Sequence, residues 1–182
     1  MSKKHYILYS IIFASLIVLS NYTVQFQINE WLTYGAIAYP FTYLFSDILS
    51  ENNSKKETLR VVQLGAILAI IPTLFLADFR IALGSISAFF LIQQLDVHIF
   101  HALKKRFSSL WWLRNNGSTL VSQFFDSLVF WVVAFAGVMP TPVLIKLFIG
   151  DYLFKVVAAL LDTPFFYAFA IKMQLNRVQK IS

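Results

Sequence analysis

Long runs of apolar residues alternate with short polar segments along the whole chain. Because about 20 apolar residues of helix cross the ~30 Å hydrocarbon core of a bilayer, each long run predicts one membrane-spanning helix. Six such runs are present, over approximately residues 6–23, 31–50, 60–77, 81–101, 117–138 and 142–171. The segments between them are short. The pattern therefore predicts an all-α, polytopic integral membrane protein in which residues 1–182 form a single bundle of six transmembrane helices.

Helix-capping and helix-breaking residues refine these boundaries. The segment Asn115-Asn116-Gly117-Ser118 is typical of a helix start and predicts that the fifth helix begins near residue 117. Pro40 lies inside the second run. The sixth run is longer than a simple crossing needs, so either this helix tilts strongly or Asp162-Thr163-Pro164 breaks it near the cytoplasmic face. Proline-interrupted spans occur at transporter binding sites, although a proline kink is also common in membrane helices.

Composition supports the membrane assignment. Of the 182 residues, 58% are hydrophobic and only 13% are charged, whereas soluble domains carry about 25% charged residues. The mean hydropathy is +0.68. The absence of cysteine excludes disulfides and thiolate metal sites. The chain is therefore expected to have the lipid bilayer as its main surroundings.

The net charge of +6 reflects topology. Most lysines and arginines fall on one side of the predicted bundle, at Lys3, Lys4, Lys55, Lys56, Arg60, Lys104, Lys105, Arg106, Arg114, Lys172, Arg177 and Lys180. The opposite side carries Arg80. Because positive residues accumulate in cytoplasmic loops, both termini are predicted to be cytoplasmic. Basic charges scattered over separate loops do not form a nucleic-acid surface, so no nucleic-acid partner is expected.

Polar residues within the predicted spans are the candidate functional groups. The carboxylates are Asp47, Asp96, Asp126, Asp151 and Asp162, and they are joined by Lys146, Lys155, Gln93, Gln94 and Gln123. A charge at the centre of a bilayer helix costs about 2.5–3.5 kcal/mol on insertion scales, so such residues usually face the interior. They predict an internal polar site, and the alternative is a set of ion pairs and hydrogen bonds that holds the helices together.

Helix geometry pairs some of these groups. If the fifth and sixth helices form an antiparallel hairpin about Pro140-Thr141, Asp126 lies level with Lys155. Asp151 precedes Lys155 by four residues, the favoured order for an acid–base pair on one helix. Asp162 follows seven residues later on nearly the same face. The spacing predicts that Asp126 meets a polar stripe formed by these three residues.

A second pattern links the fourth and fifth helices. Residues 93–100 and 123–130 both read Q-x-x-D-x-x-x-F, which puts Gln93 beside Asp96 and Gln123 beside Asp126 on a helix face. A carboxylate accepts two N–H donors, and an amide both donates and accepts. With aromatic rings, these groups suit a flat, hydrogen-bonding heterocycle. No metal-binding or nucleophile motif is present, so no metal, cofactor or catalytic residue is predicted.

Three blocks of sequence resemble the queuosine precursor transporter family, also called the vitamin uptake transporter family. The first is P-x-x-x-x-x-x-D-x-x-x-E, with Asp47 and Glu51. The second ends in Gln93-Gln94-Leu95-Asp96. The most specific runs from residue 114 to residue 127 and carries Arg114, Asn115, Ser118, Thr119, Gln123 and Asp126. Ser127 stands where the family usually has threonine, and Asn52-Asn53-Ser54 replaces a V-Y-G-like stretch.

The resemblance implies a multi-pass transporter, not an enzyme, that imports 7-cyano- or 7-aminomethyl-7-deazaguanine across a prokaryotic inner membrane. A guanine-like ring would present N1–H and its exocyclic amine to Asp126 or Asp96, and O6 to Gln123 or Gln93. Asp151, Lys155 and Asp162 would complete the pocket or couple transport to protons.

Two other functions are compatible with the sequence. One is a substrate-binding membrane subunit of a multi-component importer for a small heterocycle, which would need a separate energising complex. The other is a membrane enzyme acting on a lipid or peptide, which the missing motifs disfavour. The energy source, the preferred deazaguanine and a homo-oligomeric state are left open by the sequence.

Overall fold

Helices account for almost all the regular structure in the computed structural model, which describes residues 1–29 and 32–172. In chain order they are α1 (Lys3–Thr23), α2 (Tyr34–Ala38), α3 (Pro40–Asn52), α4 (Lys55–Leu76), α5 (Phe79–Ala88), η1 (Phe89–Gln93), α6 (Gln94–Arg106), α7 (Trp111–Phe135), α8 (Thr141–Phe166) and η2 (Tyr167–Lys172). The elements η1 and η2 are π-helices. Within the described residues there is no β-strand, so the predicted all-α class is confirmed there.

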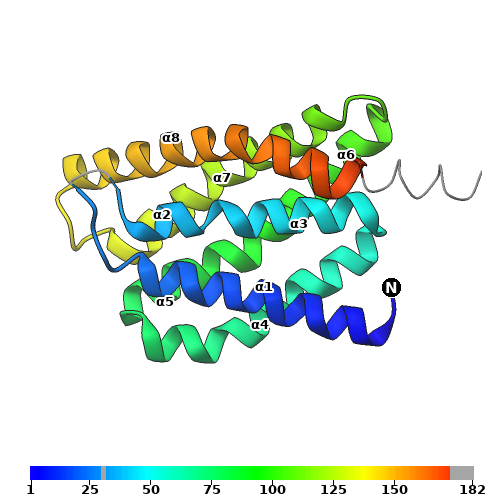
Figure 1. The fold of residues 1–182 in the computed structure, drawn as a ribbon. Helices are drawn as coiled ribbons and strands as arrows, with labels where there is room; N and C mark the ends of the chain where they lie inside the picture. Colours follow the sequence, from blue (N-terminus) through cyan, green and yellow to red (C-terminus); the bar gives the residue numbers. More distant parts are fainter. Residues whose placement is uncertain (30–31, 173–182) are drawn as a thin grey trace, which may run out of the picture.

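The helices lie side by side in one elongated bundle, with the connecting segments at its two ends (Figure 1). The N-terminus, the turn between α3 and α4 and the loop between α6 and α7 lie at one end. The described chain also ends there, at residue 172. This arrangement agrees with an even number of crossings. The predicted cytoplasmic placement of that end remains a prediction, and Arg177 and Lys180 lie outside the described residues.

Four helical segments are long and apolar enough to cross a bilayer. They are Lys3–Thr23, Lys55–Leu76, Phe79–Arg106 and Trp111–Phe135. The predicted second span is divided into α2 and α3, each too short to cross alone, and its first residue, 31, is outside the described part of the chain. The predicted sixth span falls on α8 and η2, and α8 carries four charged residues: Lys146, Asp151, Lys155 and Asp162. The count of six spans therefore remains a prediction.

Two expected boundaries differ from the structure. Helix α7 begins at Trp111, before the predicted start near residue 117, because the polar segment is part of the helix. Ser118, for example, donates its hydroxyl to the backbone oxygen of Arg114 at 2.7 Å, a bond that satisfies it within a helix. Pro164 does not break α8, and the π-helix η2 follows it. Such local widening accommodates proline in membrane helices.

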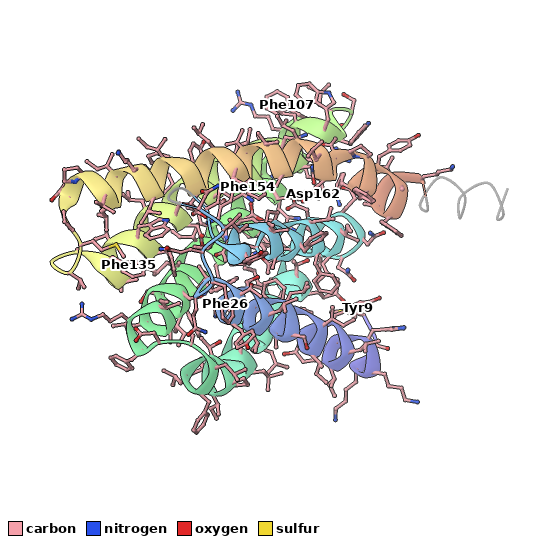
Figure 2. All side chains as sticks on the ribbon, turned by 60° about the vertical axis from the view of Figure 1, so that its left-hand side comes forward. Tyr9, Phe26, Phe107, Phe135, Phe154 and Asp162 are labelled. Atoms are coloured by element: carbon pink, nitrogen blue, oxygen red, sulfur yellow. The ribbon has the colours of Figure 1, made fainter. Side chains whose placement is uncertain are left out.

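Apolar side chains cover the outside of the bundle and polar ones lie within it, the reverse of a soluble protein. Phe75 is 86% exposed, whereas Asp96 and Gln123 are both 0% exposed. Side chains project outward all round the helices (Figure 2). The buried apolar residues form a larger cluster around Phe13 and Tyr43 and a smaller one around Phe100. An apolar exterior suits lipid, and the buried polar groups must be satisfied by one another or by a ligand.

Candidate functional site

Among the helices of the described residues, α7 supplies the largest share of the buried polar side chains. Eight of them recur at three- and four-residue intervals, as one face of a helix requires: Arg114, Asn115, Ser118, Thr119, Ser122, Gln123, Asp126 and Ser127. Helix α7 packs closely against α5, α6 and α8. Helix α3 packs instead against α6, α8 and η2, and its own buried polar residues face α7 across the interior. The space between α3 and α7 is therefore filled mainly by polar side chains.

Three contacts cross this space in antiparallel order. The Tyr39 hydroxyl, between α2 and α3, donates to Oδ1 of Asp126 at 2.5 Å. Further along α3, Asp47 Oδ2 accepts from the Thr119 hydroxyl at 2.9 Å. At the end of α3, Glu51 pairs with Arg114. The first and third of the three sequence blocks that carry the family resemblance are thus bonded to each other.

Lys155 of α8 lies at the centre of the polar group that includes Asp126. Its Nζ atom is 2.7 Å from Oδ2 of Asp151 and 3.4 Å from Oδ2 of Asp126. It also donates to the Ser127 hydroxyl oxygen at 3.0 Å. The predicted contact of Lys155 with Asp126 and the predicted pair with Asp151 are both confirmed. An ammonium group has three donors, and each has an acceptor here.

Three side chains that were not among the predicted site residues complete this group. The Ser127 hydroxyl donates to Asp151 Oδ2 at 2.7 Å, and the Trp131 indole N–H donates to the same oxygen at 3.4 Å. The Lys155 Nζ atom also lies 4.3 Å from the centre of the Tyr39 ring, within range of a cation–π contact. Trp131 follows Ser127 by one helical turn, a spacing visible in the sequence. Tyr39 is distant in sequence, and only the fold brings it here.

A cavity adjoins this group, which we call the lysine cluster and which consists of Tyr39, Asp126, Ser127, Trp131, Asp151 and Lys155. It is lined by residues of α1, α2, α5, α7 and α8, and Asp126, Asp151 and Lys155 are among them. The cavity has a volume of about 20 Å³, and one water molecule needs about 10–15 Å³. A fused heterocycle does not fit in that volume. The structure therefore shows the site in a closed form, with the lysine and the carboxylates bonded to each other.

The predicted residues Gln93, Asp96 and Gln123 are buried but do not line this cavity. Gln93 ends the π-helix η1, a kind of helix that often marks functional sites. Asp96 faces Ser118 and Ser122 of α7 and Asp47 of α3. Many buried atoms in this region have no hydrogen-bond partner in the described structure: Tyr43 Oη, Ser46 Oγ, Asp47 Oδ1, Ser50 Oγ, both amide atoms of Gln93 and of Gln123, both oxygens of Asp96, Asn115 Oδ1 and Ser122 Oγ. We call these groups the unpartnered region.

Tyr43, a member of the unpartnered region, connects that region to the lysine cluster. Its ring centre is 5.8 Å from that of Tyr39, and its side chain lies within electrostatic range of Asp126, Asp96 and Asp47. The two polar groups are therefore consecutive parts of one interior.

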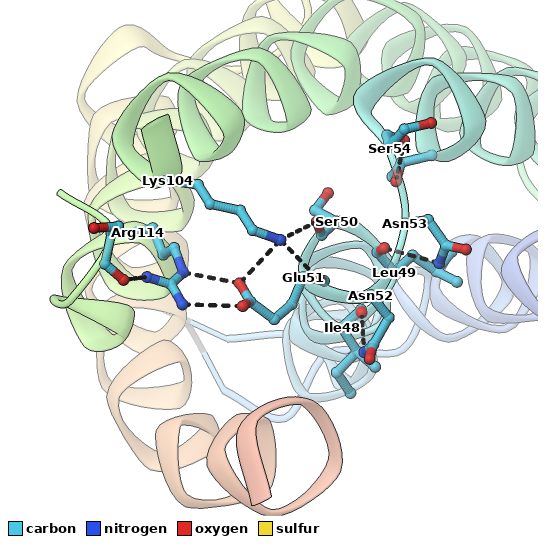
Figure 3. Close-up of polar contacts among 11 residues, drawn as sticks. Ile48, Leu49, Ser50, Glu51, Asn52, Asn53, Ser54, Lys104 and Arg114 are labelled. Carbon is cyan, nitrogen blue, oxygen red and sulfur yellow. Dashed lines mark hydrogen bonds and ion pairs between the residues drawn. The ribbon is translucent and has the colours of Figure 1, made fainter. Parts of the chain in front are cut away.

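A third polar group closes one end of that interior (Figure 3). Arg114 Nε and Nη2 donate to the two carboxylate oxygens of Glu51 at 2.8 and 2.9 Å, a bidentate pair. Arg114 Nη1 also donates to the Ser108 carbonyl at 2.8 Å. Lys104 Nζ lies 3.5 Å from Glu51 Oε2 and donates to the Ser50 carbonyl at 3.2 Å. These bonds join the ends of α3, α6 and α7.

Other candidate residues lie apart from these groups. Asp162 is half-buried on α8 (Figure 2) and has no hydrogen bond or ion pair within the described structure, so it does not join the stripe predicted with Lys155. Gln94 accepts from Gln63 at 3.0 Å, away from the interior groups. Within residues 1–29 and 32–172, no cluster of three histidine or acidic side chains could hold a metal ion.

Comparison with known proteins identifies relatives of the chain. A sequence profile described as "Putative vitamin uptake transporter" matches residues 71–169. A "Probable queuosine precursor transporter" of Bacillus subtilis (strain 168) is 35% identical over 175 residues, 82% of this chain and 76% of the relative. The "Queuosine precursor transporter" of Escherichia coli (strain K12) is 30% identical over 185 residues, 87% of this chain and 83% of the relative. No solved structure matches the chain.

Proposed function

Because the chain belongs to the queuosine precursor transporter family, whose members are described as putative vitamin uptake transporters, we propose that it carries a queuosine precursor across a membrane. The substrate is 7-cyano- or 7-aminomethyl-7-deazaguanine, and the membrane is the inner membrane of a prokaryotic cell. One observation carries the proposal: carboxylate and amide side chains are fully buried in a bundle with an apolar exterior. Such groups inside a membrane protein mark a substrate or ion pathway.

Asp126 is the group best suited to recognise the heterocycle by hydrogen bonding. It lines the cavity and lies beside the Tyr39 ring. The deazaguanine N1–H and exocyclic amine are adjacent donors, and a carboxylate accepts two donors side by side. Tyr39 and Phe130 supply aromatic surface beside it, and stacking of a base on an aromatic ring contributes about 1–3 kcal/mol.

Gln123 complements Asp126 from one turn away. Its side chain is buried and neither amide atom has a hydrogen-bond partner in the described structure. An amide N–H directed at the heterocycle O6 would satisfy both groups. Gln93 occupies the corresponding position in the related Q-x-x-D pattern and is equally buried and unpartnered.

Substrate entry requires the closed cavity to widen. The Tyr39 hydroxyl and Lys155 now occupy both oxygens of Asp126, so the substrate must replace at least one of them. The junction of α2 and α3 at Tyr39 and Pro40 is the natural point for that movement, because proline leaves one backbone hydrogen bond unmade. Interrupted helices line the binding sites of many transporters.

The substitution Asp126→Asn tests this function. It removes one acceptor and the negative charge but keeps the shape of the side chain. In cells that cannot make the precursor, we expect the variant to abolish precursor-dependent formation of queuosine in tRNA while the protein still inserts. Asp78→Asn is the matched control, because Asp78 is an exposed helix cap and asparagine caps equally well. Normal uptake by Asp126→Asn at equal expression would contradict the role.

Purified protein in liposomes separates a self-sufficient transporter from a subunit that needs an energising complex. Uptake of 7-cyano-7-deazaguanine by the purified chain alone supports the first. Binding without uptake supports the second.

A further inference from the structure

We propose that Asp47 and Asp96 form a proton site, distinct from the substrate cavity, which binds one proton that moves with the substrate in each transport cycle. The proton-coupled step rests on the proposed transport function. The proton site itself rests on the geometry of the two carboxyl groups, so the two can be tested separately.

The two carboxyl groups are buried and face one another. Asp47 is 1% exposed and Asp96 is 0% exposed. They come from α3 and α6, and their side chains lie within hydrogen-bonding reach of each other. Asp47 Oδ2 accepts from the Thr119 hydroxyl. The other three oxygens have no hydrogen-bond partner in the described structure. What this pair lacks is a donor between its oxygens, and a single proton supplies one.

Within the described residues, no lysine, arginine or histidine forms an ion pair with Asp47 or Asp96, so no cation of this part of the chain neutralises either carboxyl group. The nearby cations Lys155 and Arg114 are bonded to other carboxylates. Two carboxylates sharing a dry site cannot both be ionised, because their mutual repulsion adds to the cost of burial. A shared proton removes one charge and bridges the pair.

The other groups that the described part of the chain places around the pair add no positive charge. From α7 the pair is faced by the hydroxyls of Ser118, Ser122 and Thr119. From α3 it is faced by the Tyr43 phenol and, at the end of the helix, by the Glu51 carboxylate. Hydroxyl groups can pass a proton along but cannot neutralise a carboxylate. A hard divalent cation takes six or more oxygen ligands, whereas a proton needs only two facing oxygens.

Tyr43 gives a physical route for coupling. Tyr39, Tyr43 and Asp47 follow one another at four-residue intervals, so they lie on one face of α2 and α3. Tyr39 bonds to Asp126 in the substrate site, and Tyr43 lies between Asp126 and the carboxyl pair. When the substrate replaces Tyr39, movement of α3 separates Asp47 from Asp96. The pair then loses the facing oxygen that held the proton, and Asp96 releases the proton to water on the opposite side.

Reconstituted protein tests the coupling. Liposomes containing the purified chain and a pH-sensitive dye receive 7-cyano-7-deazaguanine under an imposed proton gradient. We expect accumulation of the substrate above its external concentration, with acidification of the interior. We expect Asp96→Asn and Asp47→Asn to bind the substrate but to lose both accumulation and acidification. Asp78→Asn keeps both. Accumulation driven by a sodium gradient, or accumulation that persists in both asparagine variants, would overturn the coupling.

Infrared spectroscopy tests the proton site without transport. A protonated carboxyl group in a dry site shows a C=O stretching band that a carboxylate lacks. We expect such a band in the native protein at neutral pH and its loss in Asp96→Asn and in Asp47→Asn. A native spectrum without it, or a band unchanged in both variants, overturns the site. If the native protein fails to bind any deazaguanine, the proposed function falls, and the infrared result still decides the proton site.

Discussion

The lysine cluster and the unpartnered region are both buried, polar and drawn from several helices, yet they differ in how their bonding is completed. In the lysine cluster, Lys155 has an acceptor for each of its donors, and both oxygens of Asp126 and the Oδ2 atom of Asp151 are bonded. In the unpartnered region, Asp96 and Gln123 have no partner in the described structure. Buried polar groups without partners cost free energy. Such a cost is tolerated where a ligand or a proton completes the bonding during function.

The ion pairs of the lysine cluster occupy the same groups that we propose for substrate binding. The unpartnered region has no such internal substitute. We therefore expect changes in the lysine cluster to alter stability first. Changes in the unpartnered region should first alter substrate binding, at Gln123, or proton coupling, at Asp47 and Asp96.

The largest loss of stability is expected for Lys155→Met. It leaves Asp126 and Asp151 facing each other without a cation, and removing one partner of a buried ion pair costs about 3–5 kcal/mol. Thermal unfolding of the detergent-purified protein measures the loss. Alanine at both Lys155 and Asp126 should cost less than the sum of the two single changes, because the two side chains are in contact. Additive losses would show that their contact carries no energy.

Arg114→Ala is expected to cause the next largest loss of stability. It removes a bidentate pair with Glu51 and a bond to the Ser108 carbonyl. Hydrogen bonds to charged groups are each worth about 1.5–3 kcal/mol, and Lys104 still neutralises Glu51, so a loss of about 3 kcal/mol is expected. Arg114→Lys keeps the charge but loses the bidentate geometry of the guanidinium group, so it should recover part of the lost stability. Full recovery by lysine would mean that charge alone matters at this end.

Tyr39→Phe removes a single hydrogen bond from the lysine cluster and keeps the ring. Asp126 retains Lys155, so a loss of about 1.5 kcal/mol is expected, the low end for a bond to a charged group. Because the hydroxyl competes with the substrate for Asp126, the variant should bind 7-cyano-7-deazaguanine more tightly. Calorimetric titration measures the affinity. Weaker binding would show that the hydroxyl contacts the substrate directly.

Gln123→Met gives the smallest change in stability and the opposite sign. It replaces an unpartnered buried amide with an apolar side chain of similar shape, so we expect a gain of about 1 kcal/mol. Substrate binding should nevertheless fall, since the amide donor is lost. The result separates this region sharply from the lysine cluster. A loss of stability with unchanged binding would show that Gln123 has a structural partner and no ligand.

The pairing of Lys155 with Asp126 and Asp151 was predictable, because helical spacing and a short hairpin determine it. The Tyr39–Asp126 bond was not, since it joins residues far apart in the chain through the packing of α3 opposite α7. Asp162 has the right spacing on α8 but does not join the stripe. Helical periodicity places a residue on a face, and the neighbouring helices decide what that face meets.

By itself, the amino-acid sequence determined the helical class, the membrane surroundings and the family, because apolar length, charge asymmetry and spaced polar motifs are local properties. It also identified Asp47 and Asp96 as separate motif residues. Only the tertiary structure decided that these two carboxyl groups face one another, and that the lysine cluster is bonded within itself. Those facts depend on distances between helices, which arise when the whole bundle packs.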